Sequence, residues 1–331
     1  MKSLSDLLAV ISAEKRRLCY VFNLDGLGIF KQLQFEEFLY RRATSVSKNC
    51  AFLLVNNLAR TEKSSIILGL SGKPGDFIRD IQLCRRENVE VIKRFTGGGT
   101  VVVDKNIVIS SIIATHEWMN GYVNRHAGAG AYGGVASSAD PKTPNMPVIS
   151  QWLVDAIYRK SGIFNSRFGL LDGDFVVESP LSQFKGSESA KVQVESPENN
   201  SVHYKVGGNA QACSTSAFVY HTSFLWSISP NISRLLVKPK RRPKYRGERD
   251  HGEFLKSVQL GLSNEYRDSG KFANALRGMV DDYRLVEIEG DSRNEEEVTD
   301  KNHPQRLIIR GNVIDEAIES MDKLSTVLLD I

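Results

Sequence analysis

Apolar residues recur at two different spacings along the chain, and each spacing predicts a different element. Residues 33–45 carry apolar side chains at helical intervals and predict a helix. Residues 51–57 and 65–70 are short apolar runs followed by turn residues, which is typical of buried strands. The stretch 71–76 predicts a loop, and 77–88 returns to a helical pattern.

A run of three glycines separates the next two predicted strands. Residues 89–95 predict a strand that leads directly into the glycines, and β-character resumes over 100–113. Residues 148–162 show an amphipathic helical pattern that ends at Gly162, a residue suited to a helix C-cap. Strands mixed with helices throughout indicate the α/β (α+β) class.

Two polar stretches interrupt this pattern. Residues 179–203 are rich in Ser, Glu, Asn and Pro, and 289–304 are acidic and polar, so neither has much to bury. An apolar helical pattern returns within 307–331. These features predict a short appended element at the C-terminus rather than a full second domain.

Length and composition fit a globular protein with a substantial core. The chain has 331 residues, 41% of them apolar, and no run of about 18 apolar residues that would predict a membrane-spanning helix. Its four cysteines, Cys19, Cys50, Cys84 and Cys213, lack paired spacing, which favours a reducing compartment. Residues 1–18 lack the apolar core of a secretory signal, so a cytoplasmic and a mitochondrial location both stay open.

The net charge of +4 hides an uneven distribution. The segment 234–249 contains eight basic residues and one acid, Glu248, which leaves the rest of the chain at −3. A general polyanion-binding surface is therefore unsupported, and one concentrated basic segment requires an explanation.

The glycine run is the strongest local signal for chemistry. Glycines let a backbone approach a ligand closely, and with Lys93 and Arg94 beside them such a loop suits a phosphate or a carboxylate. The spacing matches neither of the two common nucleotide-binding loops, and a glycine hairpin without a ligand is the alternative. The candidate ligand-binding residues of this loop are Arg94, Thr96, Gly97, Gly98, Gly99 and Thr100.

Two further motifs follow along the chain. Lys205 precedes the small residues of Val206–Gln211, where a lysine can reach a polyanion; a solvated turn is the alternative. The segment 238–251 combines prolines with basic residues and a histidine, as K-P…P-K-Y-R…R…H. It could clamp a phosphate, or form a solvated or nucleic-acid-binding patch.

The order and separation of these motifs resemble the lipoate–protein ligase A family of the biotin/lipoate ligases. Lys93–Asp104 matches the family's R-R-x-[ST]-G-G-G-[AT]-V-[YF]-H-D, and Lys205–Gln211 matches K-[IF]-[SG]-G-[NS]-[AS]-Q. Gly173–Phe175 loosely matches an S-D-L element, and Tyr220–Leu225 is similar to H-H-G-T-L-L. Lys238–Phe254 matches K-x-P-x-x-x-P-x-Y-R-x-x-R-x-H-x-x-F.

The resemblance implies a fold and a division of the chain. We expect a biotin/lipoyl protein ligase-like catalytic domain with a mixed sheet flanked by helices over 31–285, carrying the polar insert 179–203. An N-terminal extension over 1–30 and an acidic appendage over 286–331 lie outside it.

The resemblance also implies an adenylate-forming ligase. Such an enzyme joins lipoate, or a similar medium-chain acid such as octanoate, to AMP with ATP and releases pyrophosphate. It then transfers the acyl group to a lysine of a lipoyl acceptor domain, in a dehydrogenase complex or the glycine-cleavage H protein. Mg²⁺ is expected with ATP, with ligands unknown. A nucleic-acid partner is disfavoured.

The resemblance assigns roles to particular residues. Lys205 would stabilise negative charge on the α-phosphate, and Asp174 would position the acceptor amine or orient Lys205; a turn residue is the alternative for Asp174. His221 is a core or pocket-wall residue, and the basic segment would close over the adenylate. Further substrate- or ATP-binding candidates are Gly207, Gly208, Asn209, Ala210, Tyr245, Arg246 and Arg249.

The chain departs from the family pattern at two positions and leaves two other functions open. Val103 stands where the family has histidine, and Lys93 replaces the first arginine of the pair. One alternative is an octanoyltransferase or lipoyltransferase of the same fold, for which Cys213 is the nearby candidate nucleophile. The other is a non-catalytic binding module that retains the fold.

Overall fold

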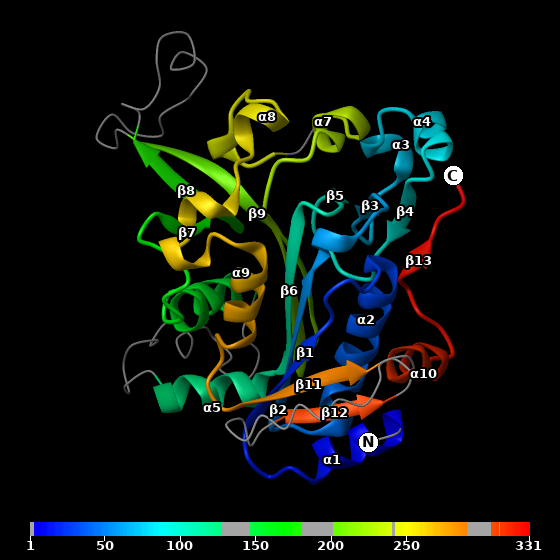
Figure 1. Ribbon diagram of the computed structural model, residues 1–331, viewed down its shortest axis with the longest axis vertical. Coiled ribbons are helices and arrows are strands. Elements are labelled where there is room, and N and C mark those ends of the chain that lie inside the picture. Colours follow the sequence, from blue (N-terminus) through cyan, green and yellow to red (C-terminus); the bar gives the residue numbers. More distant parts are fainter. Residues whose placement is uncertain (1–2, 127–145, 181–200, 240–241, 290–305, 311) are drawn as a thin grey trace.

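Two sheets make up the framework of the protein (Figure 1). In the computed structural model, the larger sheet has nine strands among the described residues, in the order β12-β11-β1-β2-β6-β10-β9-β8-β7. The smaller has four, in the order β13-β4-β3-β5. The described residues are 3–126, 146–180, 201–239, 242–289, 306–310 and 312–331.

The large sheet is mixed, as predicted. Strands β12, β11, β1 and β2 run parallel to one another, and every pairing from β2 onwards, through β6, β10, β9, β8 and β7, is antiparallel. Its strands are β1 (Leu18–Asn23), β2 (Cys50–Asn57), β6 (Ile107–Thr115), β7 (Phe168–Leu171), β8 (Asp174–Pro180), β9 (Ser201–Cys213), β10 (Ala217–Leu225), β11 (Tyr283–Glu289) and β12 (Arg306–Arg310).

The small sheet holds the glycine run between two of its strands. Strand β3 lies between β4, which runs parallel to it, and β5, which runs antiparallel, so the glycines connect strands on either side of β3. Its strands are β3 (Ser65–Leu68), β4 (Glu90–Lys93), β5 (Val101–Val103) and β13 (Val327–Leu328).

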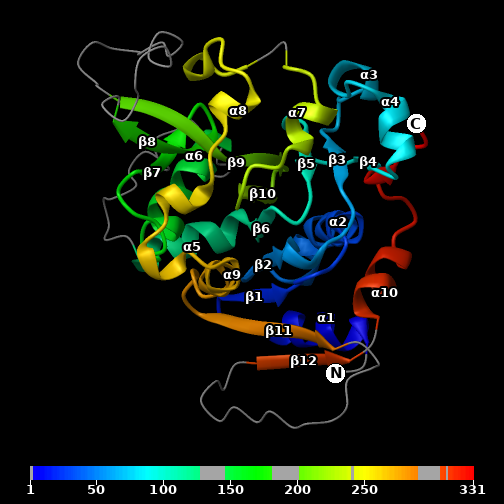
Figure 2. The same ribbon diagram turned by 45° about the horizontal axis from the view of Figure 1, so that its top comes forward.

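Helices cover both faces of the large sheet, which confirms the predicted fold class (Figure 2). Alternation along β1 shows the two faces: Cys19 and Val21 pack with residues of α5, α6 and α9, whereas Tyr20 and Phe22 pack with residues of α1, α2 and α10. The helices are α1 (Leu4–Ala13), α2 (Ile29–Val46), α3 (Pro74–Phe77), α4 (Ile81–Arg86), α5 (His116–His126), α6 (Met146–Trp152), α7 (Asn231–Leu235), α8 (His251–Phe254), α9 (Ser269–Arg277) and α10 (Val313–Glu319).

Most predicted elements are present, with shifted boundaries. The predicted loop 71–76 contains the start of α3, and the predicted helix 77–88 is limited to α4, which begins after Asp80 because that side chain caps the Leu83 N–H. The predicted strand 100–113 is divided into β5 and β6. The helix that starts as α6 continues as a wider helical turn to Tyr158, and Gly162 follows with φ +70°.

The C-terminal part of the chain contributes strands to both sheets. β11 spans residue 285 and pairs with β1, while β12 pairs with β11 and β13 pairs with β4. The division into an extension, a catalytic domain and an appendage stays a prediction. Of the insert 179–203, residues 181–200 lie outside the described residues. In the part of the chain that the structure describes, no helix is long and apolar enough to cross a membrane.

Candidate active site

Lys205 and Asp174, far apart in sequence, meet on adjacent strands. The Lys205 ammonium donates to Asp174 Oδ1 at 2.6 Å, and Tyr245 Oη donates to Asp174 Oδ2 at 3.0 Å. Asp174 starts β8 directly after the hairpin turn Asp172–Gly173, whose two φ angles of +51° and +81° suit an Asp-Gly pair. The two predicted catalytic residues thus form one hydrogen-bonded cluster with Tyr245.

The environment of this cluster shapes its chemistry. Tyr245 is buried, and burial together with the Asp174 carboxylate raises the pKa of its phenol, so Tyr245 acts as a donor. The Lys205 and Asp174 side chains keep 25% and 15% of their surface exposed, so a ligand can reach the ammonium. A register shift of β9 against β8 at Phe175 and Val176 accompanies this placement.

Strand β9 also supports the glycine run, which we call the glycine loop (Arg94–Thr100). Gly97 pairs with Gln211, and a Cβ on Gly98 would lie 2.9 Å from Asn209 O. Gly98 has φ +111°, so glycine is required there for conformation as well as for space. Farther along the strand, a Cβ on Gly208 would lie 3.9 Å from Lys205 Nζ. The glycine loop therefore packs on the same strand, β9, that carries Lys205.

Arg94 holds the glycine loop from inside. Its buried guanidinium donates to the carbonyls of Gly97 and Gly99, at 3.1 and 2.7 Å, and to Thr96 Oγ1 at 3.0 Å. Burial lowers the pKa of Arg94 to about 10, and the nearby Glu36 carboxylate opposes this shift. Arg94 stays a predicted ligand-binding residue, but the contacts that the structure shows are all to its own loop and to β3.

The basic segment (residues 238–254) lies beside Lys205. Leu255 bridges to Lys205 in parallel register, and Arg249 Nη1 donates to His203 O at 3.0 Å. Arg249 also donates to the carbonyls of Tyr245 and Arg246, so it fixes the segment's own fold. These bonds hold Tyr245 against Asp174.

Two buried polar atoms near these motifs have no hydrogen-bond partner among the described residues. They are Arg246 Nη2 and Thr100 Oγ1. Arg246 is 4% exposed and stacks on Phe254, and burial lowers its pKa. Because buried polar groups are normally satisfied, both atoms are candidates for contact with a bound ligand.

Much of the charge between residues 234 and 249 is already compensated. Lys238 and Arg242 both pair with Glu248, Arg234 pairs with Glu87, and Arg246 and Arg249 are buried. Lys240 and Arg241 lie outside the described residues. The described cations of this segment do not form an open basic surface of the kind that binds nucleic acid.

A buried polar network under β10 surrounds His221. Its Nδ1 lies 3.0 Å from Glu36 Oε2 and 2.9 Å from Ser111 Oγ, and its Nε2 lies 3.2 Å from Ser223 Oγ. Of the two predicted alternatives, the structure therefore shows His221 as a buried, hydrogen-bonded core residue. Glu36, which is fully buried, was not predicted; the only signal was an acidic pair, Glu36-Glu37, inside an apolar helical pattern.

Comparison with known proteins bears on the family and the fold of this chain. Residues 29–129 match the family model of the lipoyl protein ligase A/B catalytic domain. A Plasmodium falciparum protein named inactive lipoate–protein ligase 2 is 26% identical over 286 residues, which is 80% of this chain and 69% of the relative. The resemblance to the lipoate–protein ligase A family is confirmed.

Solved structures agree on the fold. A bipartite lipoate protein ligase from Thermoplasma acidophilum aligns over 92% of this chain and 91% of its own, with a TM-score of 0.53 and 16% identity. The chain therefore has a lipoate ligase-like fold.

Within this lipoate ligase-like fold, Cys213 lies far from Lys205. Eight residues of extended strand separate their Cα atoms by roughly 26 Å. Cys213 Sγ is 3.7 Å from His116 Nε2, but that nitrogen also lies 2.9 Å from Ser214 O, which can only accept. Nε2 thus carries a proton and cannot take one from the thiol. Burial raises the pKa of Cys213, which is the opposite of nucleophile activation.

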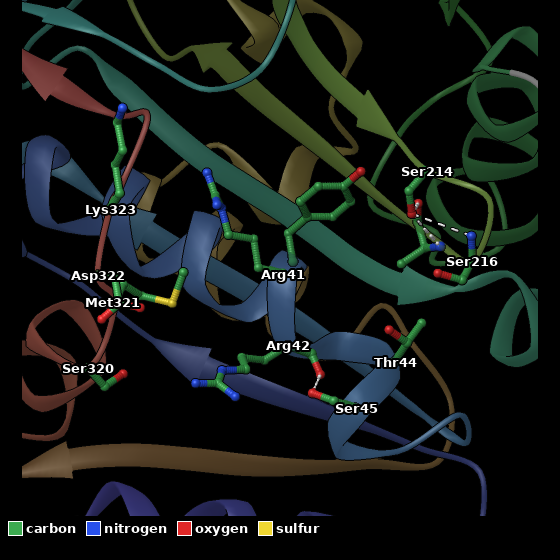
Figure 3. Close-up of a pocket in the computed structure, with 12 residues that line it drawn as sticks. Arg41, Arg42, Thr44, Ser45, Ser214, Ser216, Ser320, Met321, Asp322 and Lys323 are labelled. Carbon is green, nitrogen blue, oxygen red and sulfur yellow. Dashed lines mark hydrogen bonds between the residues drawn. The ribbon is translucent and has the colours of Figure 1, made fainter.

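A surface pocket of about 640 Å³ also lies away from Lys205 (Figure 3). Its walls are the last turns of α2, the turn between β9 and β10, and the segment 320–323 after α10. Among the described residues no group of three His, Cys, Asp or Glu side chains is placed to hold a metal ion.

Proposed function

We propose that the protein activates lipoate, or a similar medium-chain acid such as octanoate, with ATP and transfers the acyl group to a lysine of a lipoyl domain. The observation that carries this proposal is the cluster of Lys205, Asp174 and Tyr245, whose lysine lies on the strand that supports the glycine loop.

In the first step, a carboxylate oxygen of the acid attacks the α-phosphorus of ATP, and the bond to pyrophosphate breaks. Negative charge gathers on the α-phosphate oxygens, where a compact ammonium such as Lys205 stabilises it. The partnerless Arg246 Nη2 and Thr100 Oγ1 are further donors for this group. Mg²⁺ is expected to arrive with ATP, because this ion binds largely through substrate phosphates.

In the second step, the acceptor lysine nitrogen attacks the acyl carbon, an amide forms and AMP leaves. The amine must lose a proton, and Asp174 is the carboxylate beside Lys205. Its two oxygens bind Lys205 and Tyr245, so its orientation is fixed before substrate arrives. The acceptor would be a lipoyl domain of a dehydrogenase complex or the glycine-cleavage H protein, in the cytoplasm or the mitochondrion; the Thermoplasma structure is likewise described with an E2 lipoyl domain.

A second function is a protein that keeps the binding site without the activation step. Two observations favour it: the Plasmodium relative is named inactive, and Val103 replaces the family's histidine in a buried position of β5. Such a protein would bind a preformed acyl-adenylate, either as a transferase or as a non-catalytic module.

One experiment separates these functions. The protein is incubated with a lipoyl domain and either ATP plus lipoate or preformed lipoyl-AMP, and pyrophosphate and the acceptor mass are measured. Both arms modify the acceptor if the proposal holds. Modification from lipoyl-AMP alone, without pyrophosphate in the ATP arm, would overturn activation and leave transfer. An unmodified acceptor in both arms, with correctly folded protein, would support the binding module.

A further inference from the structure

Glu37 binds the backbone of a segment almost 290 residues away. This side chain is fully buried on α2, and its two oxygens accept the N–H groups of Ser325 and Thr326, each at 2.8 Å. Arg41 pairs with the same carboxylate at 2.5 Å. Charge-assisted bonds of this kind are about twice as strong as neutral ones, so Glu37 is a firm anchor for residues 325–331, which we call the brace.

The brace lies along the strand that leads into the glycine loop. Val327 and Leu328 pair antiparallel with Lys93 and Ile92, and Leu329 N donates to Val91 O at 2.8 Å. The side chain of Leu329 packs against the apolar cluster of the small sheet. Without the brace, β4 would be an edge strand with unpaired backbone groups.

The brace also contacts Phe95, the second residue of the glycine loop. The Phe95 N–H donates to Thr326 Oγ1 at 3.3 Å, and Thr326 is 1% exposed. The Phe95 ring packs on Tyr40 of α2 with 5.7 Å between ring centroids. The start of the glycine loop is therefore fixed by α2 directly and, through Glu37, by the brace.

The route of the chain explains how this contact is reached. After α10 the segment 320–323 passes alongside α2 near Arg41 before the brace begins (Figure 3). Arg41 Nη2 donates to Ser325 Oγ at 3.1 Å as well as to Glu37. The entry to the brace is thus held on both its backbone and its side chains.

We propose that Glu37 and the brace are positioning elements that keep the glycine loop in its ligand-binding conformation. Arg94 shapes the loop from inside, whereas Thr326 and β13 fix its entry from outside. The inference deepens the proposed function, on which its ligand-binding arm rests, and its conformational arm is independent of that function.

The test compares Glu37→Gln with a matched control. An amide side chain keeps the size but can accept only through one oxygen, so one of the two backbone N–H groups loses its partner. Glu316→Gln is the control, because Glu316 accepts the Leu4 N–H at 2.8 Å and also joins distant segments, but on the α1 side. Hydrogen exchange of residues 94–100 and binding of a non-hydrolysable octanoyl-adenylate analogue are measured in the full chain.

We expect Glu37→Gln to speed amide exchange in the glycine loop about tenfold and to weaken analogue binding by a similar factor. Glu316→Gln should leave both unchanged, because the amide oxygen can still accept the single Leu4 N–H. If the exchange of 327–329 rises in Glu37→Gln and the glycine loop stays protected, the brace does not position the loop and the inference is wrong.

A second pair of variants covers the case in which Glu37→Gln fails to fold. Thr326→Val keeps the shape of the side chain but removes the acceptor of the Phe95 N–H, and Thr326→Ser restores it. We expect faster glycine-loop exchange in the first variant and recovery in the second; equal exchange in both would overturn the proposal. If the wild type does not bind the analogue, the proposed function fails, and the exchange data still decide the role of the brace.

Discussion

Strand β9 carries, eight residues apart, the predicted catalytic lysine, Lys205, and the candidate nucleophile of the transferase alternative, Cys213. At Lys205, the ammonium donates to Asp174, and the Tyr245 phenol donates to the other oxygen of the same carboxylate. Arg246, next to Tyr245 in the chain, has a buried Nη2 without a partner in the described part of the chain. At the Cys213 end, the neighbouring histidine nitrogen already donates to a backbone carbonyl, and burial raises the pKa of the thiol.

The difference shows that a pair of reactive residues is not in itself a site. His116 and Cys213 are close, but the hydrogen-bonding capacity of the shared nitrogen is used by the hairpin that connects β9 and β10. Lys205 keeps two further N–H donors beyond its bond to Asp174 and a quarter of its side-chain surface exposed. Unused donors that face a reachable position distinguish a candidate active site from a packed pair.

The largest effect is expected when the Lys205 ammonium is removed, and this variant tests most directly whether Lys205 rather than Cys213 belongs to the active site. Lys205→Ala should lower acyl transfer from ATP and lipoate about 10²–10³-fold, because a donor aimed at developing charge contributes on this scale. Mass spectrometry of the acceptor domain measures the effect, and circular dichroism checks the fold. An equal acceptor mass shift in wild type and variant would mean that Lys205 has no role in the reaction.

Replacing the Asp174 carboxylate with an amide should have the next largest effect on acyl transfer. Asp174→Asn removes a charged hydrogen-bond partner, a loss of about 1.5–3 kcal/mol, or roughly 10- to 150-fold in activity. Tyr245→Phe removes only the phenol's bond to the same carboxylate and should cost less. Steady-state rates of acceptor modification rank the two variants, and the reverse order would place the main support of Lys205 on the basic segment.

Acidification should lower the stability of the folded protein through protonation of His251, which lies in the basic segment. Burial, together with the Arg246 charge, lowers the pKa of His251 to about 4 from an ordinary 6.5, so the unfolded chain binds the proton more readily. The contribution of neutral His251 to stability is therefore present above pH 6.5 and is lost as the pH falls towards 4. Because His251 stays partly in contact with solvent, we expect the free energy of unfolding to fall by about 1–2 kcal/mol between pH 7 and pH 4.5. Denaturant titrations at the two pH values measure this difference. His251→Gln should flatten this dependence; an unchanged slope would exclude His251 as its source.

The smallest change is expected at Cys213. Cys213→Ser should alter ATP-dependent acyl transfer less than about twofold, because its thiol is roughly 26 Å of strand from Lys205. The same mass-spectrometric assay, run beside Lys205→Ala, checks it. Lost transfer in Cys213→Ser with activity intact in Lys205→Ala would reverse the comparison and favour a thioester mechanism.

Sequence patterns predicted those helices and strands whose own residues favour the secondary structure that they adopt. Apolar periodicity located α2, β2, β3 and β4 because each buries a regular set of side chains. It missed that Lys205–Gln211 lies within β9, since Gly207, Gly208 and Asn209 are poor strand formers. That stretch is a strand because β8 and β10 pair with it on both sides, which is information held elsewhere in the chain.

The candidate site shows the same limit. The motif order offered Lys205, Asp174 and Tyr245 as separate candidates, and the structure places them in one hydrogen-bonded cluster, while their roles stay predictions. The environments of charged residues could not be predicted. Nothing in the sequence marks Glu36 and Glu37 as buried acids, yet both are fully buried because their partners come from β6, β10 and the brace. Whether a charge faces a ligand or the protein depends on such distant contacts.

The closest approach in the small sheet has a consequence for how this sequence can change over time. A Cβ on Gly69 would lie 2.3 Å from the carbonyl oxygen of Gly98, and Gly98 itself has φ +111°. Gly69 cannot accept a larger residue while the Gly98 carbonyl stays where it is, and a Cβ on Gly98 would lie 2.8 Å from Arg94 Nη2 and 2.9 Å from Asn209 O. Among descendants of this chain that keep the glycine loop, we expect the two glycines to be inherited as a pair, and their joint loss to mark lineages in which the loop has been rebuilt or its ligand abandoned.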